Sequence, residues 1–310
     1  MLSSSQTAAT GADHPVQGIT LDAAGIPLSA LHARPATAPR ATVVAIHGAG
    51  MRAGYFHHPV SNDLSLLALG TQLGFSVLAL DRPGYGASAG ALPQGQTLAE
   101  QTDTLGAALH TFADRHELGA GLFLLAHSYG GKLALSTAAR PPDLPVLGCD
   151  ISGCGYLFAR EPGSTAPDQW QRDMRGNNWG PLGLYPTDTF RLSRSLLTAM
   201  PPREAAEIRH WPQTLESMAR RIRVPLRFTF AEHERRWRHD REALAALRTV
   251  LSAAPVTTAH QATAGHNISL GRTARTYHLK ALTFFEEQLA REMPAELPAG
   301  PRPPIGFSAA

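Results

Sequence analysis

Residues 124–131, LLAHSYGG, decide the fold, because they place a single serine between a run of aliphatic residues and a pair of glycines. Residues 121–128 have the uninterrupted apolar pattern of a strand buried on both faces. Residues 130–140 continue directly with a helical pattern. Small residues at 126, 130 and 131 would let the strand and helix backbones approach closely around Ser128. The stretch therefore predicts a nucleophile elbow, with Ala126 where such motifs usually carry glycine.

Further apolar runs rich in β-branched residues flank this stretch and alternate with helical patterns. This alternation predicts an α/β fold with a mostly parallel sheet flanked by helices. An antiparallel hairpin is expected before them, around the turn signal Ala24-Gly25. The expected strands cover residues 41–48, 74–81, 121–128, 144–152 and 224–230, and the expected helices cover residues 97–116, 130–140, 240–251 and 273–292.

One connection is too long for a simple crossover, because about seventy residues separate the strands at 144–152 and 224–230. Aromatic residues lie there among arginine, proline and glycine. We expect residues 156–215 to form a mainly helical cap over the carboxyl ends of the strands, where open α/β sheets bind ligands. The core is then expected to comprise residues 16–155 and 216–292. Residues 1–15 and the Pro-rich residues 293–310 are expected to be flexible tails.

Composition limits the classes of function. Hydrophobic residues make up 43% and charged residues 17% of the 310 residues, as in ordinary globular proteins. A formal net charge of +3 argues against a nucleic-acid partner. No signal peptide or membrane-spanning run is evident, and Cys149 and Cys154 lie in an apolar stretch typical of buried thiols. These features predict a cytoplasmic protein without a membrane partner.

Four motifs in order along the chain give a family resemblance: the serine motif, HGAG at 47–50, DRPGYGAS at 81–88 and AGHNISL at 264–270. Over about residues 16–292 the sequence resembles the α/β-hydrolase superfamily. The resemblance implies an α/β-hydrolase fold with a catalytic triad in the order serine, acid, histidine, and it implies no cofactor or metal. Epoxide hydrolases and dehalogenases of this fold carry aspartate at the elbow, so the serine disfavours them.

A serine hydroxyl is a weak nucleophile at neutral pH and needs a base, which a third group must orient. The resemblance implies Ser128 as nucleophile and His266 as base. It places the acid at Glu234, after the strand at 224–230, with Glu232 as the alternative. Asp150, one strand earlier, is a less favoured position for the acid.

The tetrahedral intermediate also needs amide donors for its oxyanion. Tyr129, immediately after the nucleophile, is expected to supply one amide, and Ala49 the other, with Gly50 as the alternative. Some aromatic and loop residues are candidates for the substrate pocket, although an aromatic residue of the cap could equally form the cap's own core. The candidate pocket residues are Gly50, His57, Trp170, Trp179 and Tyr185.

These residues predict a serine hydrolase acting on a carboxylic ester, lactone or thioester. The substrate is expected to be a small acyl compound, either free or attached to a carrier protein. An acyltransferase, a cyclase or a C–C bond hydrolase would use the same triad. A non-catalytic ligand receptor on the same fold is the alternative from another class, because a fold does not fix a function.

Overall fold

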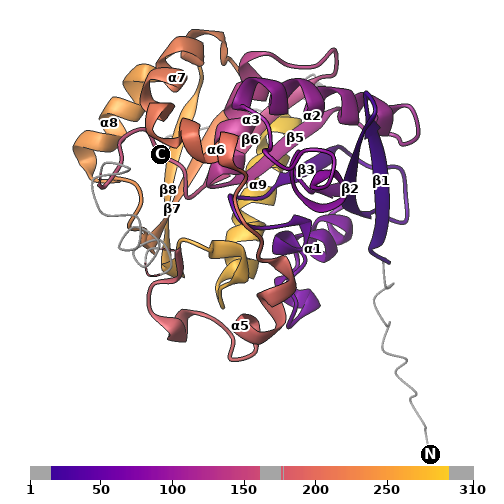
Figure 1. Ribbon diagram of the computed structural model, residues 1–310, viewed down its shortest axis with the longest axis horizontal. Coiled ribbons are helices and arrows are strands. Elements are labelled where there is room, and N and C mark those ends of the chain that lie inside the picture. The colour runs from indigo at the N-terminus through magenta and orange to yellow at the C-terminus, as the bar shows by residue number, and fades with distance from the viewer. Residues whose placement is uncertain (1–14, 161–175, 177, 293–310) are drawn as a thin grey trace, which may run out of the picture.

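An eight-stranded sheet forms the centre of the computed structural model, which describes residues 15–160, 176 and 178–292 (Figure 1). The strand order is β1-β2-β4-β3-β5-β6-β7-β8. The first two strands form an antiparallel hairpin, β2 pairs antiparallel with β4, and the other neighbours are parallel. The strands are β1 Gln17–Ala23, β2 Ile26–Ala33, β3 Thr42–Ile46, β4 Ser76–Leu80, β5 Leu122–His127, β6 Val146–Ser152, β7 Leu226–His233 and β8 Val256–Gly265.

Helices cover both faces of this sheet. The described α-helices are α1 Leu66–Gln72, α2 Leu98–Ala113, α3 Tyr129–Ala139, α5 Thr189–Leu192, α6 Pro202–Glu207, α7 Trp211–Met218, α8 Arg241–Val250 and α9 Ala274–Glu292. Short 3₁₀ helices lie between them: η1 Ala53–Phe56, η2 Asn62–Leu64, η3 Gly86–Ser88, η4 Leu182–Leu184, η5 Ser193–Leu196, η6 Ile208–His210, η7 Ala219–Arg221 and η8 Ile268–Leu270.

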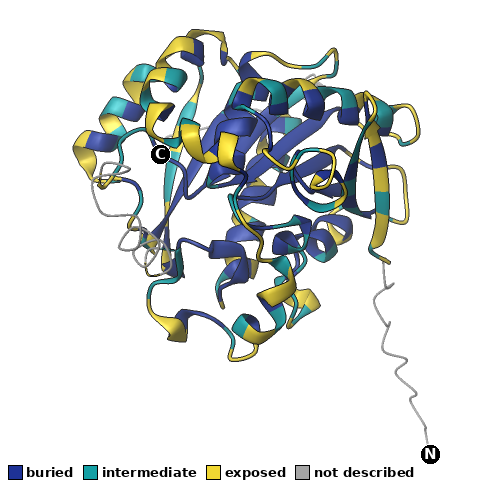
Figure 2. Cartoon of the chain, viewed as in Figure 1, coloured by how far each residue is buried: buried dark blue, intermediate teal, exposed yellow. Residues whose placement is uncertain are grey.

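The two larger hydrophobic clusters pack against the two faces of the sheet. One joins the sheet to α2, α3, α7 and α8, and the other joins it to α1 and α9. The central strands are buried along their whole length, as Figure 2 shows, because helices lie on both sides. This architecture confirms the predicted α/β fold and the edge hairpin, whose turn residues Ala24 and Gly25 both have positive φ.

Local sequence signals explain where several helices begin. Helix α2 begins with a capping box, in which Thr97 accepts from the amide of Glu100 and the Glu100 carboxylate accepts from the amide of Thr97. Helix α8 begins after Asp240, whose carboxylate accepts from the amide of Ala243 at 3.0 Å. Such caps fix the ends of the helices that pack against the sheet.

The connection between β6 and β7 contains α5, α6 and α7 with the short helices around them. Helix α7 packs against α3, and Glu204 of α6 reaches the loop after β4. The expected tails, residues 1–15 and 293–310, lie almost entirely outside the described residues. Within the part of the chain that is described, no helix combines the length and apolar character of a membrane span.

The topology brings four loops together at the carboxyl ends of the strands. Strands β3, β5, β7 and β8 run parallel, so their carboxyl ends lie together. These ends lead into the segments that contain His47, Ser128, Glu234 and His266, respectively. Residues far apart in sequence therefore meet at this edge.

Candidate active site

Ser128 occupies a sharp turn between β5 and α3, with φ 54° and ψ −118°. A non-glycine residue rarely adopts a positive φ, and such strain is retained where the surroundings enforce it. Gly130 helps to enforce this turn by letting α3 approach β3 closely, because a Cβ atom there would lie 2.2 Å from the carbonyl oxygen of Ile46. The close approach of α3 to the end of β3 thus requires glycine and leaves the Ser128 side chain partly exposed at the edge of the sheet.

His266 lies immediately after β8 and faces this serine. Its Nε2 atom is 3.2 Å from the Oγ atom of Ser128, and its Nδ1 atom is 2.7 Å from Oε2 of Glu234. A carboxylate can only accept, so the Nδ1 proton belongs to the bond with Glu234. Nε2 is then the acceptor for the Ser128 hydroxyl proton. The three side chains thus form a continuous chain of contacts, in the order serine, histidine and carboxylate that the predicted triad requires.

A turn after β7 brings the carboxylate of Glu234 into the site. The amide of Glu234 donates to the carbonyl of Ala231 at 3.0 Å, and the Glu234 side chain is buried. Burial alone would raise the pKa of this carboxyl. His266 and the amide of Arg236, which donates to Oε1 at 2.8 Å, outweigh burial and hold the pKa below its ordinary value. Glu234 is therefore ionised at neutral pH.

The alternative acids have other partners. The exposed Glu232 accepts from the amide of Thr263 at 2.6 Å, where the register of β7 and β8 shifts and Thr263 takes a positive φ. Asp150 is buried, forms an ion pair with Arg227 and accepts from the hydroxyl of Tyr277 at 2.9 Å. Of the three candidate carboxylates, only Glu234 contacts His266 in the described part of the chain.

The two predicted oxyanion donors lie on either side of Ser128. The amide of Tyr129 is in the first turn of α3, where helical amides have no intrahelical acceptor. The loop after β3 packs directly on the serine, because a Cβ atom at Gly48 would lie 3.0 Å from the Cβ of Ser128. The next amide in that loop, Ala49, has no hydrogen-bond acceptor among the described residues. Both amides are thus available to an oxyanion.

Gly50, the alternative donor, is already engaged. Its amide donates to the hydroxyl oxygen of Tyr85 at 3.2 Å, and its carbonyl accepts from the amide of Thr198 at 3.0 Å. Tyr85 belongs to the loop after β4 and donates its own proton to Glu204 at 2.9 Å. The loop that carries Ala49 is therefore fixed by a tyrosine from the DRPGYGAS motif.

A buried ion pair supports the same loop. The guanidinium of Arg82 donates to both carboxylate oxygens of Glu204, at 2.7 and 3.0 Å, and its Nε donates to the carbonyl of His47 at 2.8 Å. Burial alone would lower the pKa of Arg82, but the Glu204 carboxylate raises it. Sequence reasoning missed Arg82, Tyr85 and Glu204, and for Glu204 the sequence carries no recognisable signal.

Asp81, the first residue of the DRPGYGAS motif, has a structural role. Its carboxylate accepts from the amide of Ala53 at 2.7 Å and from the hydroxyl of Ser29 at 2.7 Å. Gly84 and Gly86 in this loop both have positive φ. The loop after β4 thus serves to hold its neighbours rather than to present reactive groups.

The ring of His127 packs against the ring of His266. The His127 ring stacks on Tyr55 at 4.8 Å and contacts the ring of His266 at 4.7 Å. Burial, reinforced by the nearby His266, lowers the pKa of His127 well below its ordinary value. His127 is therefore a neutral support for the His266 ring at physiological pH.

Apart from Gly50, described above, the candidate pocket residues fall into three groups. Trp179 and Tyr185 pack with Phe190 in an aromatic cluster, with ring centroids 5.0–5.4 Å apart, and this cluster contacts Gly265 beside the base. His57 pairs with the hydroxyl of Ser65 at 3.0 Å, and none of its described contacts reaches the triad. Trp170 lies outside the described residues.

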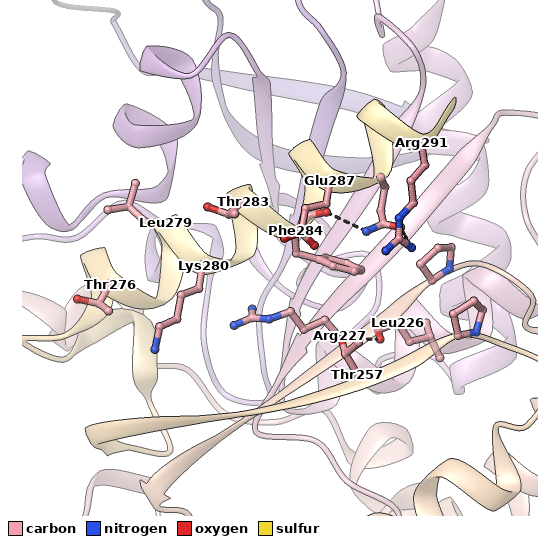
Figure 3. A pocket seen from close by; sticks show the side chains of 13 residues that line it. Leu226, Arg227, Thr257, Thr276, Leu279, Lys280, Thr283, Phe284, Glu287 and Arg291 are labelled. Atoms are coloured by element: carbon pink, nitrogen blue, oxygen red, sulfur yellow. Dashed lines mark hydrogen bonds between the residues drawn. The ribbon is translucent and has the colours of Figure 1, made fainter. Parts of the chain in front are cut away.

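A groove of about 550 Å³ lies at the other end of the strands, between the starts of β7 and β8 and helix α9 (Figure 3). Arg227, Lys280, Glu287 and Arg291 are among the residues that line it. None of its lining residues belongs to the triad. The candidate triad lies instead at the carboxyl ends of the strands.

Solved structures of several enzymes share this fold over most of both chains. A thermostable carboxyl esterase from Bacillus coagulans is 15% identical, with a TM-score of 0.63 over 88% of this chain and 99% of that chain. A proline iminopeptidase from Mycobacterium smegmatis is 16% identical, with a TM-score of 0.63 over 89% and 99%. An epoxide hydrolase from Vigna radiata is 13% identical, with a TM-score of 0.58 over 88% and 98%. At these identities the likeness concerns the fold alone.

A search of curated proteins found no match to the sequence. The sequence profile of one family, however, covers residues 43–304, which is most of the 310-residue chain. That range contains the elbow, the loop after β3, the acid turn and the histidine after β8. The chain therefore belongs to the Alpha/beta hydrolase family and has its fold.

Proposed function

We propose that this hydrolase cleaves a carboxylic ester, lactone or thioester through an acyl-enzyme on Ser128. The observation that supports the proposal most directly is the chain of contacts from Ser128 Oγ to His266 Nε2 and from His266 Nδ1 to Glu234. Such a chain supplies a nucleophile, a base and a group that orients the base. A serine at the elbow also favours acyl chemistry over the chemistry of an aspartate nucleophile.

In the proposed first step, the Oγ of Ser128 attacks the substrate carbonyl while its proton moves to Nε2 of His266. The carbonyl oxygen becomes an oxyanion, which the amides of Tyr129 and Ala49 stabilise. His266, now a cation held by Glu234, donates its proton to the departing alkoxide or thiolate. The products are the free alcohol or thiol and the acyl-serine.

In the second step, a water molecule replaces the leaving group. Nε2 of His266 takes a proton from the water as it attacks the acyl-serine carbonyl, and the same amides stabilise the second oxyanion. Collapse of this intermediate returns the proton to Oγ of Ser128 and releases the carboxylic acid. Acyl transfer and cyclisation differ only in the nucleophile of this step, which would be an alcohol or amine.

The test is covalent labelling by a fluorophosphonate together with hydrolysis of short p-nitrophenyl esters. We expect labelling and hydrolysis in the native protein and neither in Ser128→Ala. Thermal unfolding of the variant shows whether its fold is retained. A native protein that neither reacts nor hydrolyses any ester, lactone or thioester in a broad screen would instead favour a ligand receptor on this fold.

A further inference from the structure

Lys132 is buried in an aromatic box one helical turn after Ser128 on α3. Only 5% of the residue is exposed, and its Nζ atom lies 5.2–5.8 Å from the centroids of four rings. The rings belong to Tyr129, Phe158, Trp211 and Trp237. They come from α3, α7 and the loops after β6 and β7, so tertiary structure alone assembles the box.

The ammonium of Lys132 has no anionic partner among the described residues. Cys154, Glu204, Glu207 and the like-charged Arg236 act on it from a distance. Burial raises the pKa of the Cys154 thiol and keeps it neutral, and the two carboxylates are committed elsewhere. Glu204 pairs with Arg82, and Glu207 accepts from the amide of Leu98 at 2.7 Å. Lysine is almost never fully buried without a partner, since its charge loses hydration there.

Contacts with the rings offset only part of this cost. Burial, which is the largest influence, lowers the pKa of Lys132 to about 8, so much of the protein still carries the charge at neutral pH. Methionine would fill a similar volume at this position without burying a charge. A buried charge in a place that an apolar residue could fill is a mark of a functional site.

Two further buried donors belong to the same box. The hydroxyl of Tyr129 and the indole Nε1 of Trp237 have no hydrogen-bond partner in the described structure. The box thus contributes donors from three residues, and none of these donors has an acceptor within residues 15–160, 176 and 178–292. Unpaired buried polar groups are rare in native proteins, and an acceptor supplied by a ligand would satisfy them.

We propose that Lys132, with the Tyr129 hydroxyl and the Trp237 indole N–H, binds a carboxylate of the substrate. The inference rests on the proposed function and narrows it to acyl compounds that carry a second, free carboxylate, such as monoesters of dicarboxylic acids. Tyr129 connects this subsite to the reaction centre, because its backbone amide is a proposed oxyanion donor and its ring lines the box. Residues four apart along a helix lie close together, so the carboxylate would bind within about one helical turn of Ser128.

The decisive experiment measures binding without catalysis. In the Ser128→Ala background, calorimetry compares monomethyl adipate, which is anionic, with dimethyl adipate, which is neutral. We expect the anion to bind more tightly, and Lys132→Met to reduce that preference roughly tenfold to a hundredfold, as for a lost bond to a charged group. Lys280→Met is the matched control, because Lys280 is the only other lysine and is exposed on α9.

A second readout uses the active protein. The ratio of kcat/KM for mono-p-nitrophenyl adipate over p-nitrophenyl heptanoate should fall roughly tenfold to a hundredfold in Lys132→Met. Tyr129→Phe keeps the same ring and Trp237→Phe keeps a smaller aromatic ring, and each removes a single donor, so they test the subsite even if Lys132→Met fails to fold. Each should lower the same ratio by about tenfold.

Equal binding of the anionic and neutral ligands to Ser128→Ala would overturn the subsite, as would a preference that survives in Lys132→Met. Either outcome would leave the proposed function untouched, because that function is tested separately by the labelling of Ser128. A protein that binds the anion selectively but hydrolyses neither ester would retain the subsite and lose the proposed reaction.

Discussion

The Nε2 atom of His266 lies 3.2 Å from the Oγ atom of Ser128, although 138 positions separate the two residues along the chain. The contact exists because β5 and β8 end at the same edge of the sheet, with β6 and β7 between them. Glu234, at the end of β7, completes the relay from the strand beside β8. The proposed chemistry depends on the sheet order as much as on the residue types.

Replacing Glu234 by glutamine should lower kcat by roughly a thousandfold to ten-thousandfold. The amide keeps the size of the side chain but removes the negative charge and favours the wrong tautomer of His266. Steady-state kinetics on a p-nitrophenyl ester measure the effect. Glu232→Gln is the matched control, since Glu232 contacts Thr263 rather than the base. A larger loss in Glu232→Gln than in Glu234→Gln would contradict the assignment.

Tyr85→Phe tests whether Tyr85 positions the loop after β3, which carries the proposed oxyanion donor Ala49. The variant removes the hydroxyl that accepts from Gly50 and donates to Glu204. We expect kcat to fall roughly tenfold to a hundredfold with little change in KM, because the loop would shift while substrate contacts remain. Thermal unfolding should show a loss of about 1–3 kcal/mol for the unpaired groups. A change in KM alone would rule out this positioning effect.

Gly130→Ala should destabilise the protein by about 1–3 kcal/mol or more, because its Cβ would overlap the carbonyl oxygen of Ile46. Urea unfolding measures the change. In the control Gly183→Ala, the added Cβ meets nothing within 4 Å, so the change should be within about 0.5 kcal/mol. Equal effects at the two sites would show that the elbow tolerates a Cβ.

The buried Lys132 should make stability depend on pH in alkaline solution. Its pKa is lowered to about 8 in the folded protein, against about 10.4 for an ordinary lysine. Below pH 8 both states are protonated and the full cost of the buried charge remains. As pH rises from about 8 to about 10.4, the folded state loses its proton first, so the free energy of unfolding increases by about 3 kcal/mol.

Urea unfolding of the native protein and Lys132→Met at about pH 7.5 and about pH 10 isolates this contribution. The free energy of unfolding of the native protein should rise relative to that of the variant between the two pH values. A constant difference would mean that Lys132 has an ordinary pKa. Monomethyl adipate should reduce the rise, because a bound carboxylate favours the charged amine.

The sequence by itself determined the edge hairpin, the buried strands β3 to β7 and the order of the motifs, but it gave no range for β8, an edge strand that is only partly buried. Buried parallel strands are continuous apolar runs, so residues such as 121–128 predicted β5 without any knowledge of neighbours. The elbow was equally readable, because the strained turn demands small residues around Ser128. The motif order also pointed to His266 and Glu234, although it left Glu232 open.

Only the tertiary structure placed Glu234 against His266 and Glu232 against Thr263, because the turn after β7 and the register shift opposite Thr263 direct the two side chains differently. Tertiary structure alone also brought Glu204 of α6 to Arg82 and Tyr85, and Trp211 and Trp237 to Lys132. Each of these contacts joins distant segments whose local patterns carry no sign of the partner. The hydrophobic periodicity of a segment indicates which face of a helix or strand is buried. Which residues pack against that face depends on how the whole chain folds.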